Sequence, residues 1–194
     1  MKPDISIIIP LYNEVDNIEP LGLSIINAME GKNYEVVFVD DGSTDGSTKK
    51  LKEWCAQHTN FRAIHFRKNA GQTAAMDAGF RHALGKYVVS MDADLQNDPA
   101  DIPKLLEKLN NYDMVCGWRQ KRNDPWIKRI SSKVANYIRN KLSREDIKDT
   151  GCSLKAYRRE CLDHIKLYNG MHRFLPTLFK MEGFTVTEIV VNHY

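Results

Sequence analysis

The chain has 194 residues, of which 42% are hydrophobic, so it can bury the core of one domain. Its formal net charge of +3 is small and does not by itself indicate a nucleic-acid partner. The four cysteines form no Cys-x-x-Cys pair, and no apolar stretch reaches the length of a signal peptide or a membrane span. We therefore expect a soluble, cytoplasmic protein with reduced thiols.

Strands and helices are expected to alternate through the first half of the chain. Short apolar, β-branched runs predict strands at residues 5–9, where Pro10 ends the run, and at 34–39, 61–66 and 88–91. Apolar residues at helical spacing predict a helix at 18–29. A second helix should follow the loop 40–46 and end at residue 54, and a third should run from about 69 to 84. This alternation is typical of an α/β fold whose mostly parallel sheet carries helices on both faces.

The second half of the chain is less regular. We expect a helix after Pro99 to residue 109, a strand at 114–117, a helix at 174–181 and a strand at 185–191. Residues 118–144 contain nine Lys or Arg residues and one acidic residue, Asp124. Apolar residues recur there at helical spacing from Ile127 to Leu142, which predicts a basic amphipathic helix. Such a helix suits either ordinary packing on the core or contact with an anionic membrane surface.

The most informative stretch is residues 87–98, where an apolar run leads directly into Asp92 and Asp94. If the backbone stays extended, the two carboxylates project the same way at the C-terminal end of a strand. Open α/β sheets bind ligands at this edge, where the loops 10–14, 40–46, 68–71 and 92–98 should converge. Paired carboxylates suit a Mg²⁺ or Mn²⁺ ion that itself binds a diphosphate. An isolated Asp-x-Asp is more often a solvated turn, so this hypothesis depends on the other three loops.

Other familiar patterns are absent. The dinucleotide fingerprint Gly-x-Gly-x-x-Gly does not occur, so the αβ alternation does not imply NAD. The six histidines contain no His-x-x-x-His or His-Glu-x-x-His set, and we expect structural or surface roles for them.

Four motifs, in this order, resemble those of the inverting glycosyltransferases of family 2, which have the GT-A fold. They are residues 10–14 (Pro-Leu-Tyr-Asn-Glu), 40–46 (Asp-Asp-Gly-Ser-Thr-Asp-Gly), 69–71 (Asn-Ala-Gly) with Gly79, and 92–96 (Asp-Ala-Asp-Leu-Gln). Within that family, Gln96, the run 117–119, and residues 149–152 followed by 157–160 resemble the branch that glycosylates dolichyl or undecaprenyl phosphate. The Gln-x-x-Arg-Trp motif of processive polysaccharide synthases is absent.

The resemblance implies a role for each matching residue. The nucleotide sugar would be bound by Pro10, Tyr12, Glu14, Val39, Asp41, Gly71, Asp92, Ala93 and Asp94. A Mg²⁺ or Mn²⁺ ion would be held by Asp92, Asp94 and Gln96. The phosphate of the acceptor would be bound by Arg119, Lys128, Arg129 and Ser132. Catalytic roles would fall to Asp94, Arg119 and Asp149.

The chemistry of the acceptor leaves alternatives open. A phosphate monoester has a second pKa of about 6 and is mostly ionised at neutral pH, so it needs positioning by Arg119 more than deprotonation. A saccharide hydroxyl would instead need a general base, for which Asp149 is the candidate. Equally, Asp149 could orient a basic side chain or cap a turn. A third possibility is a domain that binds the nucleotide without turnover, whereas binding of nucleic acid is not expected.

We expect residues 1–194 to form one catalytic domain of the GT-A type. Its mostly parallel, Rossmann-like sheet would have a small antiparallel C-terminal addition. Residues 1–98 would bind the nucleotide sugar and residues 99–194 the polyprenyl phosphate. Relatives usually continue with a basic Arg…Gly-x-Ser-Lys segment and membrane helices, so we expect the chain to stop before a C-terminal membrane segment. The lipid acceptor and the basic region predict peripheral attachment at the inner face of the membrane.

Overall fold

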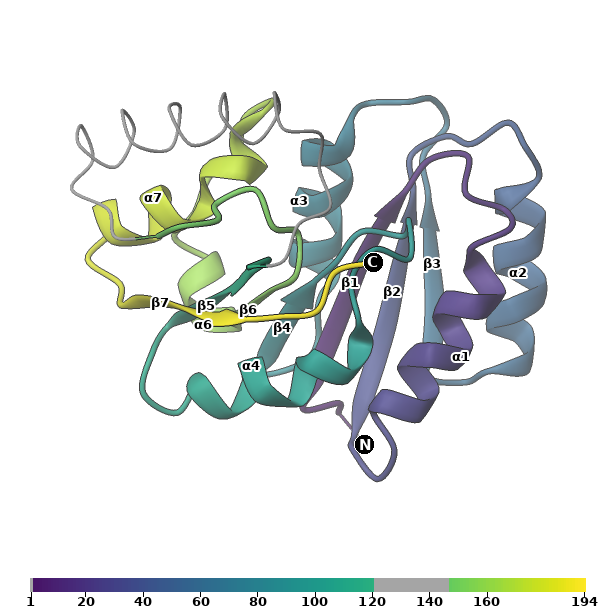
Figure 1. Cartoon of the computed structure of the whole chain (residues 1–194). Helices are drawn as coiled ribbons and strands as arrows, with labels where there is room; N and C mark the ends of the chain where they lie inside the picture. Colours follow the sequence, from purple (N-terminus) through teal and green to yellow (C-terminus); the bar gives the residue numbers. More distant parts are fainter. Residues whose placement is uncertain (1, 121–146) are drawn as a thin grey trace.

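The computed structural model describes residues 2–120 and 147–194, and their strands form one seven-stranded sheet (Figure 1). The strands are β1 (Ile5–Leu11), β2 (Tyr34–Asp40), β3 (Phe61–His65), β4 (Tyr87–Ser90), β5 (Met114–Trp118), β6 (Lys155–Arg158) and β7 (Val186–Val190). They lie in the order β3-β2-β1-β4-β6-β5-β7. Only β6 runs antiparallel to its neighbours in this sheet of the described residues. The expected mostly parallel sheet is confirmed, with its antiparallel strand in the interior of the sheet.

Helices cover both faces of the sheet, as the alternation predicts (Figure 1). The helices on one face are α1 (Ile18–Ala28), α2 (Ser47–Gln57) and α4 (Ile102–Lys108), which follows the 3₁₀ turn η1 (Pro99–Asp101). The helices on the other face are α3 (Gln72–His82), α6 (Arg159–Leu162) and α7 (Leu175–Met181), which follows the turn η2 (Met171–Phe174). Ile7 and Ile9 of β1 pack in the first core, and Ile8 packs in the second. An apolar run without alternation is what a strand buried on both faces requires.

Helix α3 packs very closely on β1, because a glycine stands at the contact. A Cβ atom at Gly79 would lie 2.1 Å from Ile8 Cγ2 and 3.3 Å from Val39 Cγ2. These distances leave no room for a side chain, so only glycine permits this approach. The contact fixes the position of α3, whose first residue, Gln72, contacts Asp92 in the site described below.

The expected end of the first strand at Pro10 is wrong, because β1 continues to Leu11. Alternate residues of a strand direct their main-chain groups to opposite sides. Leu11 O accepts the Asp41 N–H on the β2 side, and Ile8 O accepts the Met91 N–H on the β4 side. The main-chain nitrogen of residue 10 therefore points toward the β4 side of β1. Strand β4 has already ended at residue 90, so no ladder partner lies opposite this nitrogen. The missing N–H of Pro10 breaks no ladder bond there, so proline is tolerated in this central strand.

The sequence does not predict β6 or α6. The four residues of β6 begin with Lys155 and end with Arg158, so the run does not read as a buried strand. In the fold, β6 lies between β4 and β5, where Lys155 is 4% exposed and the ring of Tyr157 is fully buried. Tertiary packing therefore decides the structure of a segment whose local sequence is ambiguous.

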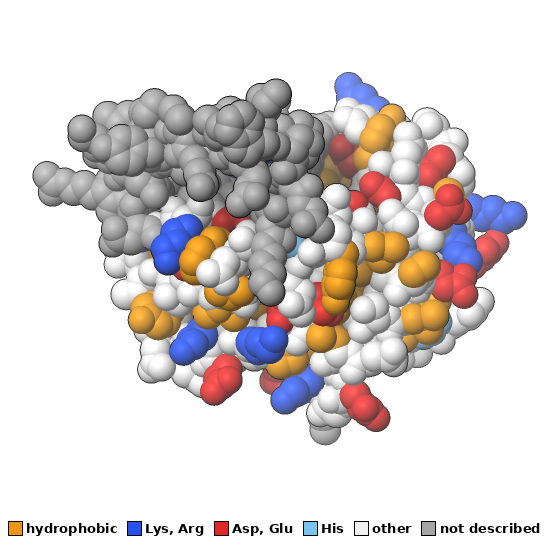
Figure 2. Space-filling model, in the orientation of Figure 1, with side chains coloured by type: hydrophobic (Ala, Val, Ile, Leu, Met, Phe, Trp, Pro, Cys, Tyr) orange, Lys and Arg blue, Asp and Glu red, His pale blue; other side chains and the backbone are white. Residues whose placement is uncertain are grey.

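The predicted basic helix from Ile127 to Leu142 lies outside the described residues, as do the predicted acceptor residues Lys128, Arg129 and Ser132. In the part of the chain that the structure describes, no helix is long and apolar enough to cross a membrane. On the described part of the face in Figure 2, acidic and basic side chains are interspersed with hydrophobic ones.

Candidate active site

The loops that follow β1 and β2 are joined by hydrogen bonds between side chains and the main chain. The Asn13 N–H donates to Ser43 Oγ at 2.9 Å, and the Thr44 N–H donates to Asn13 Oδ1 at 2.8 Å. The Val15 N–H donates to Asp45 Oδ2 at 3.1 Å. Asn13 has a φ of 58°, a left-handed conformation that asparagine adopts more readily than most residues. The two loops therefore form one rim at the C-terminal edge of the sheet.

Asp40, at the end of β2, is fully buried and forms hydrogen bonds that stabilise the loop after β2. Its Oδ1 accepts the Ser43 N–H at 2.9 Å, and its Oδ2 accepts the Thr48 hydroxyl and lies 3.1 Å from His65 Nδ1. Burial opposes ionisation of Asp40, but these hydrogen bonds outweigh it and lower the pKa of the carboxyl. Asp40 therefore holds the loop after β2 in place.

The neighbouring Asp41 joins the loop after β2 to the loop before α3. Its Oδ1 accepts the Ala70 N–H at 2.7 Å, and its Oδ2 accepts the Gly71 N–H at 2.9 Å. Gly71 has a φ of 92°, which side chains disfavour. Together with the loop after β4, the three loops meet at one edge of the sheet, as predicted.

A cleft of about 420 Å³ opens where these loops meet, and we call it the first cleft. Eight of the nine residues predicted to bind the nucleotide sugar line it: Pro10, Tyr12, Glu14, Asp41, Gly71, Asp92, Ala93 and Asp94. Val39 does not line the cleft, because its side chain is fully buried in the core under α3. Tyr12 is 45% exposed, so its ring is free to stack on a planar ligand.

Asp92 and Asp94 both line the first cleft, although the expected extended backbone does not continue through them. The chain leaves β4 before Asp92, and Leu95 has a left-handed φ of 62°. Asp92 Oδ1 accepts Gln72 Nε2 at 2.8 Å, and Asp94 Oδ1 accepts the Gln96 N–H at 3.1 Å. Both carboxylates therefore follow β4 and line the first cleft, but from a turn in place of the predicted extended backbone.

Burial raises the pKa of Asp92, and the charge of Asp94 raises it further. The Ser153 hydroxyl and the positive charges of Lys155 and Arg119 oppose this shift. The carboxylate of Asp92 is therefore ionised at a cost that a bound cation would remove.

The residues present fit a Mg²⁺ or Mn²⁺ ion that is shared with a substrate. Among the residues that the structure describes, no group of three His, Cys, Asp or Glu side chains could hold a metal ion. Gln96, the third predicted metal ligand, lines neither this cleft nor the one next to it. Its main-chain carbonyl accepts the Tyr194 N–H at 3.1 Å. Two carboxylates suffice for Mg²⁺, which takes its remaining ligands from water and substrate phosphates.

A second cleft of about 300 Å³ adjoins the first and shares Pro10, Gln72 and Asp92 with it. Its basic lining residues are Arg119, Lys155, His172 and Arg173. Burial lowers the pKa of His172, and Arg173 and Lys155 lower it further, so this imidazole is neutral at pH 7. The other basic side chains of the second cleft are Arg119, Lys155 and Arg173.

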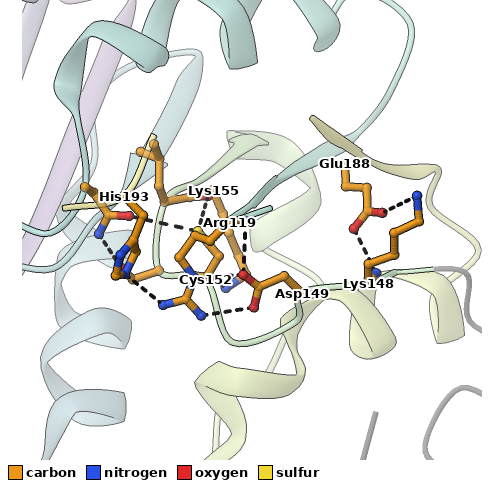
Figure 3. A network of polar contacts seen from close by, with 10 residues as sticks. Arg119, Lys148, Asp149, Cys152, Lys155, Glu188 and His193 are labelled. Atoms are coloured by element: carbon orange, nitrogen blue, oxygen red, sulfur yellow. Dashed lines mark hydrogen bonds and ion pairs between the residues drawn. The ribbon is translucent and has the colours of Figure 1, made fainter. Parts of the chain in front are cut away.

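Arg119 and Asp149 form a two-point ion pair beside the second cleft (Figure 3). Arg119 Nε donates to Asp149 Oδ2 at 2.7 Å, and Nη2 donates to Oδ1 at 3.0 Å. The side chains are 12% and 7% exposed. On its other side, Arg119 Nη1 lies 3.4 Å from His193 Nε2 (Figure 3). Both carboxylate oxygens of Asp149 accept from Arg119, so this geometry suits orientation of the guanidinium better than abstraction of a proton.

Sequence reasoning identified Arg119 but missed the other three basic residues that line the second cleft, namely Lys155, His172 and Arg173. Lys155 lies in a run, Leu154 to Tyr157, whose local sequence does not show that it forms a buried strand. His172 has no local signal: its Nδ1 lies 2.6 Å from Thr73 Oγ1, and 99 positions separate the two residues in the chain. Only the fold brings these side chains to the cleft.

Comparison with known proteins identifies the family. The family model described as glycosyl transferase family 2 matches residues 6–166. The chain belongs to glycosyl transferase family 2. A family relative, a dodecaprenyl-phosphate galacturonate synthase from Rhizobium johnstonii, is 35% identical over 199 aligned positions, which cover 98% of this chain and 59% of the relative. The chain thus spans about three fifths of the length of this curated relative.

Solved structures share the fold of this family 2 chain. A mannosyltransferase from Pyrobaculum calidifontis in complex with GDP-Man and Mn²⁺ matches with a TM-score of 0.72 and 22% identity, over 98% of this chain and 56% of the other. A glucosyl-3-phosphoglycerate synthase from Mycobacterium tuberculosis, in complex with Mn²⁺, UDP-Glc and glycerol 3-phosphate, matches with a TM-score of 0.73 and 19% identity. The match covers 99% of this chain and 72% of the other. The fold is that of the GT-A structures, as the resemblance implies. The roles of individual site residues stay predictions.

Proposed function

We propose that this chain is the catalytic part of a metal-dependent, inverting transferase that moves one sugar from a nucleotide sugar to a polyprenyl phosphate. The observation that carries the proposal is the junction of the two clefts at Asp92. One cleft holds an exposed aromatic ring and paired carboxylates, and the other is lined by cations. The first suits a nucleoside diphosphate, and the second suits a reaction partner that carries negative charge.

Each half of the chain has a part in this proposal. Residues 1–98 supply the first cleft, where Tyr12 stacks on the base and Asp41 fixes the loop that faces it. Residues 99–194 supply Arg119 and the rest of the basic lining of the second cleft. Asp92 and Asp94 would hold Mg²⁺ or Mn²⁺. Both solved structures described above contain Mn²⁺. The ion would supply charge neutralisation for the departing diphosphate.

We propose a phosphate acceptor because, among the described residues, the candidate base Asp149 is already paired with a cation. A phosphate oxygen attacks the anomeric carbon of the sugar, and the bond from that carbon to the nucleoside diphosphate breaks. Such a nucleophile is already ionised at neutral pH. Asp149, the candidate base for a hydroxyl acceptor, is paired with Arg119 through both oxygens. The 35% identical relative, named as a synthase that acts on dodecaprenyl phosphate, supports a lipid phosphate. We propose that the reaction takes place at the inner face of the membrane, because a lipid acceptor requires membrane proximity.

The test uses two acceptors that differ only in the phosphate. Labelled UDP- and GDP-sugars are incubated with the full chain, Mn²⁺ and either undecaprenyl phosphate or undecaprenol in detergent micelles. We expect label in the lipid with the phosphate only. Equal labelling of the alcohol, or transfer to saccharides alone, would contradict the proposal.

A further inference from the structure

Lys155 is a buried ammonium that faces the second cleft. It begins β6, is 4% exposed and pairs across the strands with Ser90 of β4. Its Nζ donates to the main-chain carbonyl of Cys152. This bond uses one of the three N–H groups of the ammonium. Within residues 2–120 and 147–194 it forms no ion pair with a carboxylate. The charge of Asp92 in the same cleft interacts with Lys155, but no carboxylate of the described residues lies within ion-pair distance, so an anionic ligand would stabilise the buried ammonium.

Arg173 reaches the same cleft from the turn η2 on the other side. It too forms no ion pair among the described residues, and the side chain of His172 beside it is neutral at pH 7. The turn is attached to α3, because the Gly170 N–H donates to Thr73 Oγ1 at 3.0 Å. Lys155 and Arg173 thus reach the second cleft as a pair of cations from two different elements, β6 and η2.

The position of this pair relative to the donor is set by Asp92, which lies at the junction of the two clefts. If the diphosphate is bound at Asp92 and Asp94, the sugar attached to it extends from the junction into the second cleft. The charge of Lys155 acts on Asp92, which places the ammonium within electrostatic range of that sugar. The hydroxyl groups of a neutral hexose carry no charge, so they would compensate the buried ammonium of Lys155 less well than a carboxylate would.

We propose that Lys155 and Arg173 select donors whose sugar carries a carboxylate, so that the enzyme transfers a uronic acid. This inference rests on the proposed function for the position of the donor. The carboxylate would accept from the Lys155 ammonium and from the Arg173 guanidinium, which gives charge-assisted hydrogen bonds in a partly buried cleft. The phosphate of the lipid acceptor is the other oxyanion that could meet Lys155, and the two sources make different predictions.

The experiment compares matched donors that differ only at C6 of the sugar, UDP-galacturonate with UDP-galactose and GDP-mannuronate with GDP-mannose. We expect wild-type protein to bind one of the uronates about 30-fold or more tightly than its neutral partner in calorimetry with Mn²⁺. The Lys155→Met variant should lose this preference while its affinity for the free nucleoside diphosphate stays unchanged. Arg173→Gln, at an exposed position, should lose part of the preference without a risk to folding. Lys166→Met, an exposed lysine outside both clefts, is the matched control and should behave as wild type.

Several results would overturn the inference. One is wild-type protein that binds neutral and uronate donors equally well. Another is a Lys155→Met variant that weakens both donors equally, which would indicate a role in the structure or toward the diphosphate. A third is a variant that keeps the donor preference but raises KM for the lipid phosphate, which would assign Lys155 to the acceptor. Uronate-selective binding without transfer to any lipid phosphate would instead contradict the proposed function and leave the inference standing.

Discussion

Arg119 and Asp149 are held face to face by two hydrogen bonds of 2.7 and 3.0 Å, and neither side chain is more than 12% exposed. A carboxylate that accepts twice from one guanidinium is a strong and directional partner. The pair therefore defines where the guanidinium of Arg119 stands at the second cleft. The two readings of Asp149, as an orienting residue and as a general base, predict different outcomes for one substitution.

The change Asp149→Asn keeps the shape of the side chain and one acceptor oxygen. If Asp149 orients Arg119, we expect kcat/KM for the lipid phosphate to fall about tenfold, with an unchanged pH profile, and stability to fall by about 1–3 kcal/mol. Steady-state kinetics and urea unfolding check both values. A loss of about 1,000-fold with a changed pH profile would indicate a general base and a hydroxyl acceptor.

The change Asp41→Asn should loosen the loop before α3. The two N–H groups donate to different carboxylate oxygens, and asparagine has an NH₂ group in place of one of them, so either the Ala70 or the Gly71 N–H would face a donor. We expect a loss of about 1–2 kcal/mol in unfolding free energy and about a tenfold weaker affinity for the nucleoside diphosphate. Urea unfolding and calorimetry measure the two effects. Unchanged nucleotide affinity would show that this loop does not contact the donor.

The change Asp92→Asn should stabilise the metal-free protein at neutral pH. Burial and Asp94 raise the pKa of Asp92 in the folded state, so ionisation opposes folding, and this cost grows as pH rises through that pKa. We expect the variant to melt about 2–4 °C higher than wild type at pH 7.5, and the difference to vanish at pH 3. Mn²⁺ should raise the Tm of wild type at pH 7.5 and leave the variant unchanged. A lower Tm of the metal-free variant than of wild type at pH 7.5 would contradict the claim that ionisation of Asp92 opposes folding.

The change Glu35→Gln tests a buried carboxylate away from the site. Burial opposes ionisation of Glu35, but hydrogen bonds from Arg62, Ser6 and the Leu84 N–H outweigh it and lower its pKa. Its contribution is therefore present above the unfolded pKa and is lost as pH falls through the lower, folded value. We expect the variant to lose about 1–3 kcal/mol at pH 7 and much less at pH 3. Urea unfolding at both pH values measures this, and an equal loss at both would contradict it.

The sequence alone predicts most of the sheet and the first cleft. Apolar runs mark strands that are buried on both faces, and polar clusters after them mark the loops at the C-terminal edge. The pattern fails at Pro10, since a proline in a central strand depends on where the neighbouring strand ends. It also fails at Lys155, because local sequence cannot show that a charged residue is buried by strands distant in the chain.

The second cleft could be predicted only in part for the same reason. Arg119 follows a strand and matches a family motif, so the sequence points to it. His172 and Arg173 reach the cleft through the bond between Gly170 and Thr73, which joins segments 97 positions apart. Contacts over such separations leave no trace in periodicity or propensity.

The central claim is that Asp92 and Asp94 hold a cation that binds the diphosphate of the donor. Calorimetric titration of UDP and GDP into wild type and into the double variant Asp92→Ala/Asp94→Ala, with and without Mn²⁺, tests it most directly. We expect Mn²⁺ to tighten the binding of one nucleotide by wild type at least tenfold and to have no effect on the folded double variant. An equal Mn²⁺-dependent gain in both proteins would contradict the claim.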